Sequence, residues 1–205
     1  MKLLYKTIFI SILLPLLIIS SLIIYNLVFK HIKNEIIYAI IIGSYALTFY
    51  VARRLKIMTL HYKRPTLKQI ARWSLISLFI WGGSLFEINI LNPRFHYFEY
   101  NQSEFKLTNS IYYLIFTPLL EELFMKSIFM NSLIKLKINS IVIIFLSASY
   151  FAIFHYPSIL LIHLLMGLIT SYLYYKNKDV VQCILIHSIY NGVLIIEANF
   201  FNVSN

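Results

Sequence analysis

Long apolar runs separated by short polar segments make up most of this sequence. The runs lie at about residues 4–29, 36–52, 71–91, 111–134, 139–156, 158–175 and 180–200. A helix of about 20 mainly apolar residues is long enough to cross the hydrocarbon core of a bilayer. The pattern therefore predicts an all-α, polytopic transmembrane helical bundle of about seven spans.

The first of these runs predicts a retained membrane anchor. Its apolar stretch, residues 3–29, is longer than the apolar region of a signal peptide, and no small-residue cleavage site follows it. Prolines and glycines are too few to form long linkers, so we expect residues 1–205 to form a single integral membrane domain. Its N-terminal spans lie within residues 1–110, and a motif-bearing core occupies residues 111–200.

Composition agrees with a membrane protein. Hydrophobic residues make up 60% of the chain and charged residues only 13%, against about 25% charged in a typical soluble domain. The formal net charge is +10, but the basic residues cluster between the apolar runs, which is typical of membrane topology rather than nucleic-acid binding. We therefore expect membrane lipid, and no nucleic acid, as a partner. The single cysteine, Cys183, excludes an internal disulfide bond and a multi-cysteine metal site.

The distribution of lysine and arginine predicts the orientation in the membrane. The segment between the second and third runs contains seven basic residues: Arg53, Arg54, Lys56, Lys63, Arg64, Lys68 and Arg72. Cytoplasmic segments carry such an excess, so this segment and, by alternation, the N-terminus are expected in the cytoplasm and the C-terminus outside. The segments expected outside contain fewer basic residues: Lys30, Lys33, Arg94 and Lys106. Richness in Ile, Lys, Asn and Tyr suggests a bacterial cell membrane.

Three charged residues interrupt the fourth run, in the stretch PLLEELFMKSIF. At 1.5 Å per residue, Glu121 and Glu122 lie roughly 15 Å from the outer end of this run, near the middle of a membrane. Ionisable groups there are costly and face a protein interior or a wet cavity. Adjacent helix positions diverge by about 100°, so the two glutamates are expected to have different roles. Lys126 follows Glu122 at the spacing of an ion pair, which leaves Glu121 to face a cavity.

Two later runs each carry a pair of candidate residues at helical spacing. In FAIFH, Phe151 and His155 are four residues apart, and in HSIYN, His187 and Asn191 have the same spacing. A single histidine in a span is more often an interhelical hydrogen-bonding group, and Phe151 or Asn191 alone would be a packing residue. Three polar clusters on three runs of so apolar a chain favour a shared site.

Other polar and aromatic residues of these runs are expected to be structural. His163 has no polar partner at helical spacing, and three tyrosines are expected at the membrane interface or in packing: Tyr112, Tyr113 and Tyr190. Counted along straight, upright helices, His155 would lie roughly 24 Å from the inner surface and His187 only about 10 Å. Tilt or a kink would be needed to bring the two histidines together.

The candidate residues are of the types that can hydrolyse an amide without a protein nucleophile. A carboxylate and an imidazole at one cavity can take a proton from water, and an imidazole beside an amide can donate to a developing oxyanion. The chain has no HExxH zinc motif and no GxSxG nucleophile elbow. Glu121, His155 and His187 remain a candidate set of ligands for a divalent metal such as zinc.

The ordered set EELFMK, FAIFH and HSIYN resembles the CPBP family of intramembrane proteases. This family includes type II CAAX prenyl endopeptidases and bacterial relatives linked to bacteriocin self-immunity and peptide processing. Its pattern of EExxxR, FxxxH and Hxxx(N/D) on successive membrane helices matches Glu121-Glu122, Phe151-xxx-His155 and His187-xxx-Asn191. The glycine-bearing segment between the last two motifs is also similar, so the resemblance covers about residues 111–195.

The resemblance implies an endopeptidase with two pairs of catalytic residues. Glu121 and His155 would activate the attacking water, and the oxyanion would be stabilised by His187 and Asn191. Supporting roles fall to Glu122, Lys126 and Phe151. The family's arginine is Lys126 here, which keeps the positive charge but loses the planar fork that binds a carboxylate through two bonds. Because a lysine fits the same spacing, we expect activity to be retained.

Three classes of function remain open from the sequence. The first is an intramembrane endopeptidase that cleaves a membrane-associated peptide or protein, in peptide maturation or bacteriocin self-immunity. The second is a non-catalytic membrane immunity or sensor-partner protein that keeps its polar residues for helix packing. The third is a transporter in which buried carboxylates and histidines relay protons, although paired broken helices are not evident.

Overall fold

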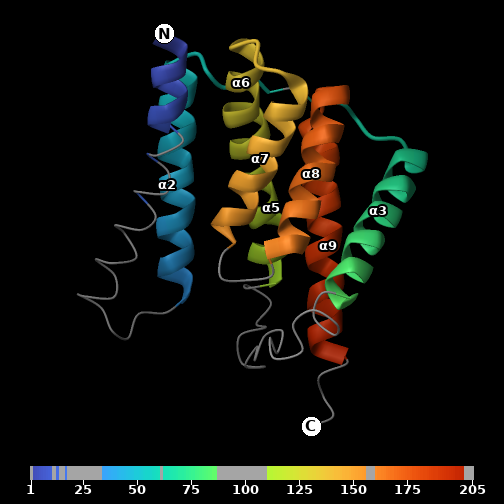
Figure 1. Cartoon of the computed structure of the whole chain (residues 1–205). Helices are drawn as coiled ribbons and strands as arrows, with labels where there is room; N and C mark the ends of the chain where they lie inside the picture. Colours follow the sequence, from blue (N-terminus) through green and yellow to red (C-terminus); the bar gives the residue numbers. More distant parts are fainter. Residues whose placement is uncertain are drawn as a thin grey trace.

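The protein is a bundle of helices that run roughly side by side (Figure 1). The computed structural model describes residues 2–10, 13, 17, 34–60, 62–86, 110–155 and 160–200. All regular secondary structure within these residues is helical. This confirms the all-α class that the apolar runs predict.

Six of the seven predicted runs correspond to helices whose ends differ by a few residues from the expected ones. The second and third runs form α2 (Asn34–Arg54) and α3 (Leu67–Phe86). The fourth forms one continuous helix built from η3 (Tyr112–Phe116), α5 (Thr117–Glu122), η4 (Leu123–Met130) and α6 (Asn131–Lys135). The last three form α7 (Ser140–Phe154), α8 (Leu160–Asn177) and α9 (Val180–Phe200). Most of the first run lies outside the described residues, although residues 2–10 are helical.

The membrane-crossing character of these helices is clearest for α9. Among the described residues, Val180–Glu197 is the one helix that is both long enough and apolar enough to cross a bilayer. Helix α7 is also apolar, but its 15 residues are fewer than a full crossing needs. The seven-span arrangement therefore remains a prediction.

Small and polar side chains bring the later helices together. Helices α7 and α8 pack closely, and a methyl group added at Gly167 would lie 2.8 Å from the Cα of Ala148. Glycine at this position lets the two backbones approach, which is the usual role of small residues in membrane helix pairs. Helix α3 packs on α9, where the Ser77 hydroxyl donates to the carbonyl of Ile186 at 2.8 Å. Near the other end, Trp81 Nε1 donates to Glu197 Oε2 at 2.7 Å.

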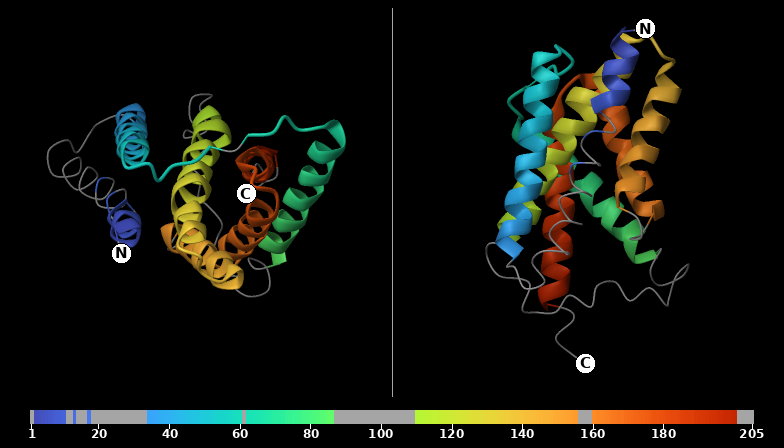
Figure 2. Two further views of the ribbon diagram at one scale, coloured as in Figure 1. Left: turned by 90° about the horizontal axis from the view of Figure 1, so that it is seen from above. Right: turned by 90° about the vertical axis from the view of Figure 1, so that its left-hand side faces the viewer.

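The described basic turns gather at one end of the bundle, together with the N-terminus (Figures 1 and 2). Three lysines that follow helix ends there adopt the left-handed conformation, with φ of 57° at Lys56, 57° at Lys137 and 52° at Lys178. The connection after α2 is fastened to η4, because the backbone N–H of Thr59 donates to the carbonyl of Ser127 at 3.1 Å. The predicted outer basic residues, Lys30, Lys33, Arg94 and Lys106, lie outside the described residues.

Candidate active site

The two adjacent glutamates occupy different surroundings at the junction of α5 and η4. The side chain of Glu121 is 22% exposed, whereas that of Glu122 is fully buried. The π-helical turns of η3 and η4 lie on either side of this junction, and such turns are frequent at functional sites. The helix therefore presents one carboxylate to an accessible space and the other to the protein interior.

Glu121 faces His155, which follows the last residue of α7. His155 Nε2 lies 3.5 Å from Glu121 Oε2, and the His155 side chain is 21% exposed. The other ring nitrogen, Nδ1, lies 2.8 Å from the carbonyl oxygen of Phe151. Since a carbonyl only accepts hydrogen bonds, Nδ1 carries the hydrogen. In the neutral ring, Nε2 is therefore the proton acceptor that faces the carboxylate.

A cavity of about 440 Å³ opens beside this pair. Glu121 and His155 both line it, and the remaining wall is largely aromatic. Four tyrosines contribute to it, two from α2 and two from η3: Tyr38, Tyr45, Tyr112 and Tyr113. Tyr38 and Tyr112 stack with ring centroids 4.0 Å apart. Tyr112 and Tyr113, which the sequence assigned to interfacial or packing roles, are thus part of the wall.

A second cluster is buried behind the cavity and joins three helices. Lys126 Nζ lies 3.6 Å from Glu122 Oε2, and both side chains are fully buried. The same ammonium group donates to the Ser171 hydroxyl of α8 at 2.9 Å. His187 Nδ1 of α9 lies 3.3 Å from Glu122 Oε1. Glu122 therefore has two cationic or donating neighbours, and Ser171 is a partner that helical spacing alone did not indicate.

Phe151 lies between the two clusters. Its ring centroid is 4.5 Å from that of His155 and 5.6 Å from that of His187. The two histidines, which straight upright helices would separate, are therefore near each other. The depths estimated from the sequence assumed upright helices, because residue positions along the chain carry no information on helix tilt.

His163 of α8 also belongs to this region, although the sequence assigned it a structural role. Its ring stacks on that of His155 with centroids 4.2 Å apart and an angle of 19° between the planes. The available signal was its position four residues before Gly167, which places it on the side of α8 that approaches α7. A third imidazole therefore adjoins the pair formed by Glu121 and His155.

Asn191 satisfies a carbonyl group that the helix bearing Glu121 leaves without a donor. The N–H of Thr117 is bonded to Tyr112 in π-helical register, so the next carbonyl, that of Tyr113, would be bonded by residue 118. Residue 118 is proline and has no N–H. The side-chain amide of Asn191 donates to the Tyr113 carbonyl oxygen at 2.9 Å instead. Neither Asn191 nor His187 is among the residues that line the cavity.

The candidate metal ligands Glu121, His155 and His187 do not form one ligand set. His187 directs Nδ1 at Glu122, whereas His155 faces Glu121. Within the described part of the chain, no three His, Cys, Asp or Glu side chains are arranged to hold a metal ion. The residues present therefore do not fit a zinc site of this composition.

The bundle thus carries two carboxylate–imidazole pairs, one at the cavity and one buried, and these are side chains of the types that can hydrolyse an amide. Residues 103–193 match the family model described as Rce1-like, type II CAAX prenyl endopeptidase Rce1-like. This segment carries all three motifs, and the match supports the resemblance to the CPBP family that the motifs indicate. The matched segment is less than half of the chain. No curated protein and no solved structure matches.

Proposed function

We propose that this protein is an intramembrane endopeptidase in which Glu121 and His155 activate water for attack on a peptide bond. The family match supports a CAAX-type protease. The observation that carries the mechanism is the 3.5 Å approach of His155 Nε2 to Glu121 Oε2 at the wall of a cavity of about 440 Å³. A buried pair without a cavity would have no access to substrate.

The two groups can share the proton transfers of hydrolysis. The hydrogen bond to Phe151 holds the His155 ring with Nε2 toward Glu121. As the water oxygen attacks the carbonyl carbon, its proton passes to this pair, which acts as general base. The same proton then goes to the amide nitrogen as the carbon–nitrogen bond breaks. The products are a carboxylic acid and an amine.

His187 and Asn191 are proposed to stabilise the oxyanion, the role that the family resemblance implies. Neither lines the cavity, but His187 is in edge-to-face contact with Phe151, which does. Glu122 accepts from Nδ1 of His187, so His187 can donate through Nε2 only when it is an imidazolium ion. Glu122 lies between His187 and Lys126 and is placed to stabilise positive charge on either side chain. Asn191 uses one amide hydrogen for the carbonyl of Tyr113, and an amide nitrogen has two. The second hydrogen is the proposed donor to substrate.

The proposed substrate is a membrane-associated peptide or protein. The aromatic wall of the cavity, with Tyr45 and Phe124 in edge-to-face contact at 6.3 Å, suits an apolar segment of peptide. The bacterial origin inferred from composition favours a leader peptide, a pheromone or a bacteriocin over a prenylated protein. A role in peptide maturation or bacteriocin self-immunity follows from that substrate class.

The test is cleavage of candidate bacterial peptides by the full chain in proteoliposomes, with products identified by mass spectrometry. We expect wild type to cleave, and Glu121→Gln and His155→Ala to lose about 10²-fold or more in rate, the usual contribution of a general base. Glu197→Gln is the control, because this carboxylate bonds to Trp81 away from the cavity. If wild type is inactive on every peptide and the substitutions change only stability, the non-catalytic immunity or sensor-partner function is favoured instead.

A further inference from the structure

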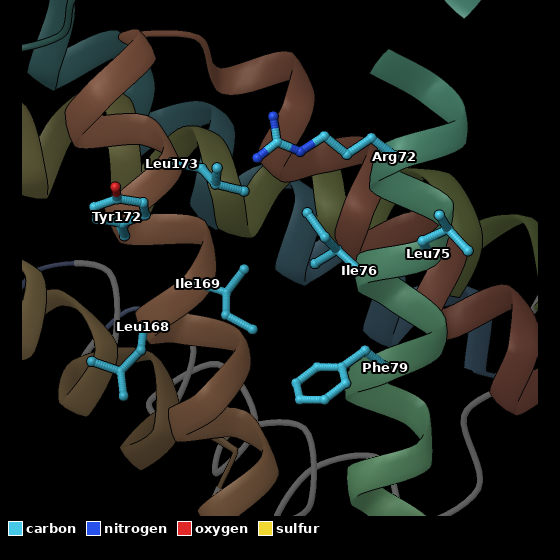
Figure 3. A pocket seen from close by; sticks show the side chains of 8 residues that line it. All are labelled: Arg72, Leu75, Ile76, Phe79, Leu168, Ile169, Tyr172 and Leu173. Atoms are coloured by element: carbon cyan, nitrogen blue, oxygen red, sulfur yellow. The ribbon is translucent and has the colours of Figure 1, made fainter. Parts of the chain in front are cut away.

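A second cavity, an open groove of about 560 Å³, lies between α3 and α8 (Figure 3). Its walls are almost entirely apolar and come from both helices: Leu75, Ile76 and Phe79 on α3, and Leu168, Ile169 and Tyr172 on α8. Several of these side chains are well exposed, including Leu75 at 67% and Phe79 at 68%. Exposed apolar surface of this kind requires an apolar cover.

Positive charge is concentrated at one end of this groove. In Figure 3 the guanidinium group of Arg72 extends across the upper end toward Leu173. Lys68 precedes Arg72 by four residues on α3 and therefore lies on the same side of that helix. On α8, the Lys176 ammonium group lies 6.0 Å from the centroid of the Tyr172 ring. Three basic side chains, those of Lys68, Arg72 and Lys176, thus lie near the helix ends at this end of the groove, which we call its mouth.

No described carboxylate forms an ion pair with these basic groups. Asp179, which follows α8, is buried and accepts from the backbone N–H groups of Lys63 at 3.4 Å and Val181 at 3.1 Å. The Asp179 carboxylate is therefore occupied by backbone N–H groups and does not neutralise the basic side chains at the groove. The positive charge at the mouth of the groove is therefore not neutralised by a described carboxylate, and it can attract an anionic ligand.

We infer that this groove binds an anionic phospholipid, with an acyl chain along the apolar walls and the phosphate group at Arg72. Basic pockets between membrane helices on the cytoplasmic side bind such headgroups, and the Rce1-like family is membrane-embedded. A free phosphate ion would leave the apolar walls uncovered. A second copy of the chain joined by two-fold symmetry would bring like charges together. A lipid with a negative headgroup complements both parts of the groove.

Native mass spectrometry of the purified full chain in detergent tests the inference. We expect phosphatidylglycerol to bind more tightly than phosphatidylcholine with the same acyl chains. Arg72→Ala should weaken phosphatidylglycerol binding about five-fold, and addition of Lys176→Ala should weaken it about 25-fold, because each basic residue near an anionic lipid surface contributes about 1 kcal/mol. Arg53→Ala is the matched control, since this exposed arginine lies at the end of α2, away from the groove.

A second pair of variants tests the apolar part. Leu75→Trp should obstruct the groove and weaken binding of both lipids, whereas Leu78→Trp, at another exposed position of α3, should not. Melting temperatures of all variants check that each is folded. Equal binding of the two lipids, equal effects of Arg53→Ala and Arg72→Ala, displacement by inorganic phosphate, or a dimer in which the groove is occupied would each overturn the proposal.

Discussion

Glu121 and Glu122 are adjacent in the sequence but have different surroundings, and we propose different roles for them. The first carboxylate is 22% exposed at the cavity, and the second is fully buried against Lys126 and His187. A carboxylate that must exchange protons with water needs access, whereas a buried one must be paired because its desolvation is costly. The difference in access is therefore the physical reason for proposing Glu121, and not Glu122, as the catalytic carboxylate.

The first prediction separates these two glutamates. Glu121→Gln should abolish cleavage with little change in melting temperature, since the amide fits the site but does not take a proton from water. Glu122→Gln should lower the stability by several kcal/mol, because it leaves Lys126 as an uncompensated buried charge. Melting temperature and cleavage rate measured on both variants provide the check. Identical behaviour of the two variants would contradict the division of roles.

The second prediction concerns the buried pair of Glu122 and Lys126. Lys126→Met should destabilise the protein by about 3–5 kcal/mol, because the carboxylate loses its cation, while Lys126→Arg should be tolerated. The double variant Glu122→Gln with Lys126→Met should recover most of the stability, as replacement of both members of a buried pair often does. Its cleavage rate should stay low, because the imidazolium form of His187 has then lost its carboxylate. Full activity in a stable double variant would show that the pair is only structural.

The third prediction distinguishes two roles of Asn191. Asn191→Ala should reduce stability by about 1–3 kcal/mol, because the carbonyl of Tyr113 is left without a donor. In a Pro118→Ala background, residue 118 has an N–H that can bond to the Tyr113 carbonyl. Asn191→Ala should therefore reduce the stability less in that background. The double-mutant cycle measures this coupling in melting experiments. If Asn191 also stabilises the oxyanion, cleavage should stay impaired in the double variant. Recovery of both stability and cleavage would assign Asn191 to positioning alone.

At the scale of elements, the contact of α7 with α8 positions the proposed site, because His155 directly follows α7 and His163 lies on α8. The backbones approach at Gly167 and Ala148, where a Cβ at position 167 would also lie 3.0 Å from the Ala148 carbonyl oxygen. Backbone atoms cannot move aside as a flexible side chain can. Any side chain at position 167 must therefore push the two helices apart.

The fourth prediction follows from this contact. Gly167→Ala should destabilise the protein by about 1–3 kcal/mol, the cost of overpacking, although alanine has the higher helix propensity. Gly82→Ala is the matched control, because a Cβ there has no neighbour within 4 Å among the described atoms. Thermal unfolding in detergent should show a lower midpoint for the first variant only. The cleavage rate should fall with it, since His155 is then displaced from Glu121. An unchanged midpoint for Gly167→Ala would contradict the close approach.

At the scale of the whole molecule, the described basic side chains are sorted toward one end of the bundle. Among described lysines and arginines, Lys126 lies in the interior, while the others lie in turns or near helix ends on the side of the N-terminus (Figure 1). From the positive-inside rule, we expect that side to be cytoplasmic. That residues 1–205 form one domain stays a prediction.

The fifth prediction is this topology. A cysteine is introduced at residue 60 in a chain whose Cys183 has been replaced. It should react with a membrane-impermeant reagent only after the cells have been permeabilised. Cys183 is itself buried, so its replacement is a precaution against background labelling. A cysteine at the C-terminal residue 205 should react in intact cells. Labelling of residue 60 in intact cells would reverse the proposed orientation.

The sequence by itself determined the helices and the identity of the candidate residues. Apolar runs of span length favour helices because a helix satisfies its backbone polar groups within a single segment in an apolar environment. The four-residue spacings of Glu122 to Lys126 and of Phe151 to His155 specify local pairs, since they depend only on helix geometry. For the same reason, the motif pattern was sufficient to indicate the family.

Only the tertiary structure decided which helices bring their polar residues together. The pairing of His187 with Glu122, the stacking of His163 on His155 and the donation from Asn191 to Tyr113 each join residues of different helices. Such contacts depend on tilt, on rotation and on the close approach at Gly167, and none of these is encoded in spacing along one helix. Helical periodicity gives the face of a residue, but packing gives its partner.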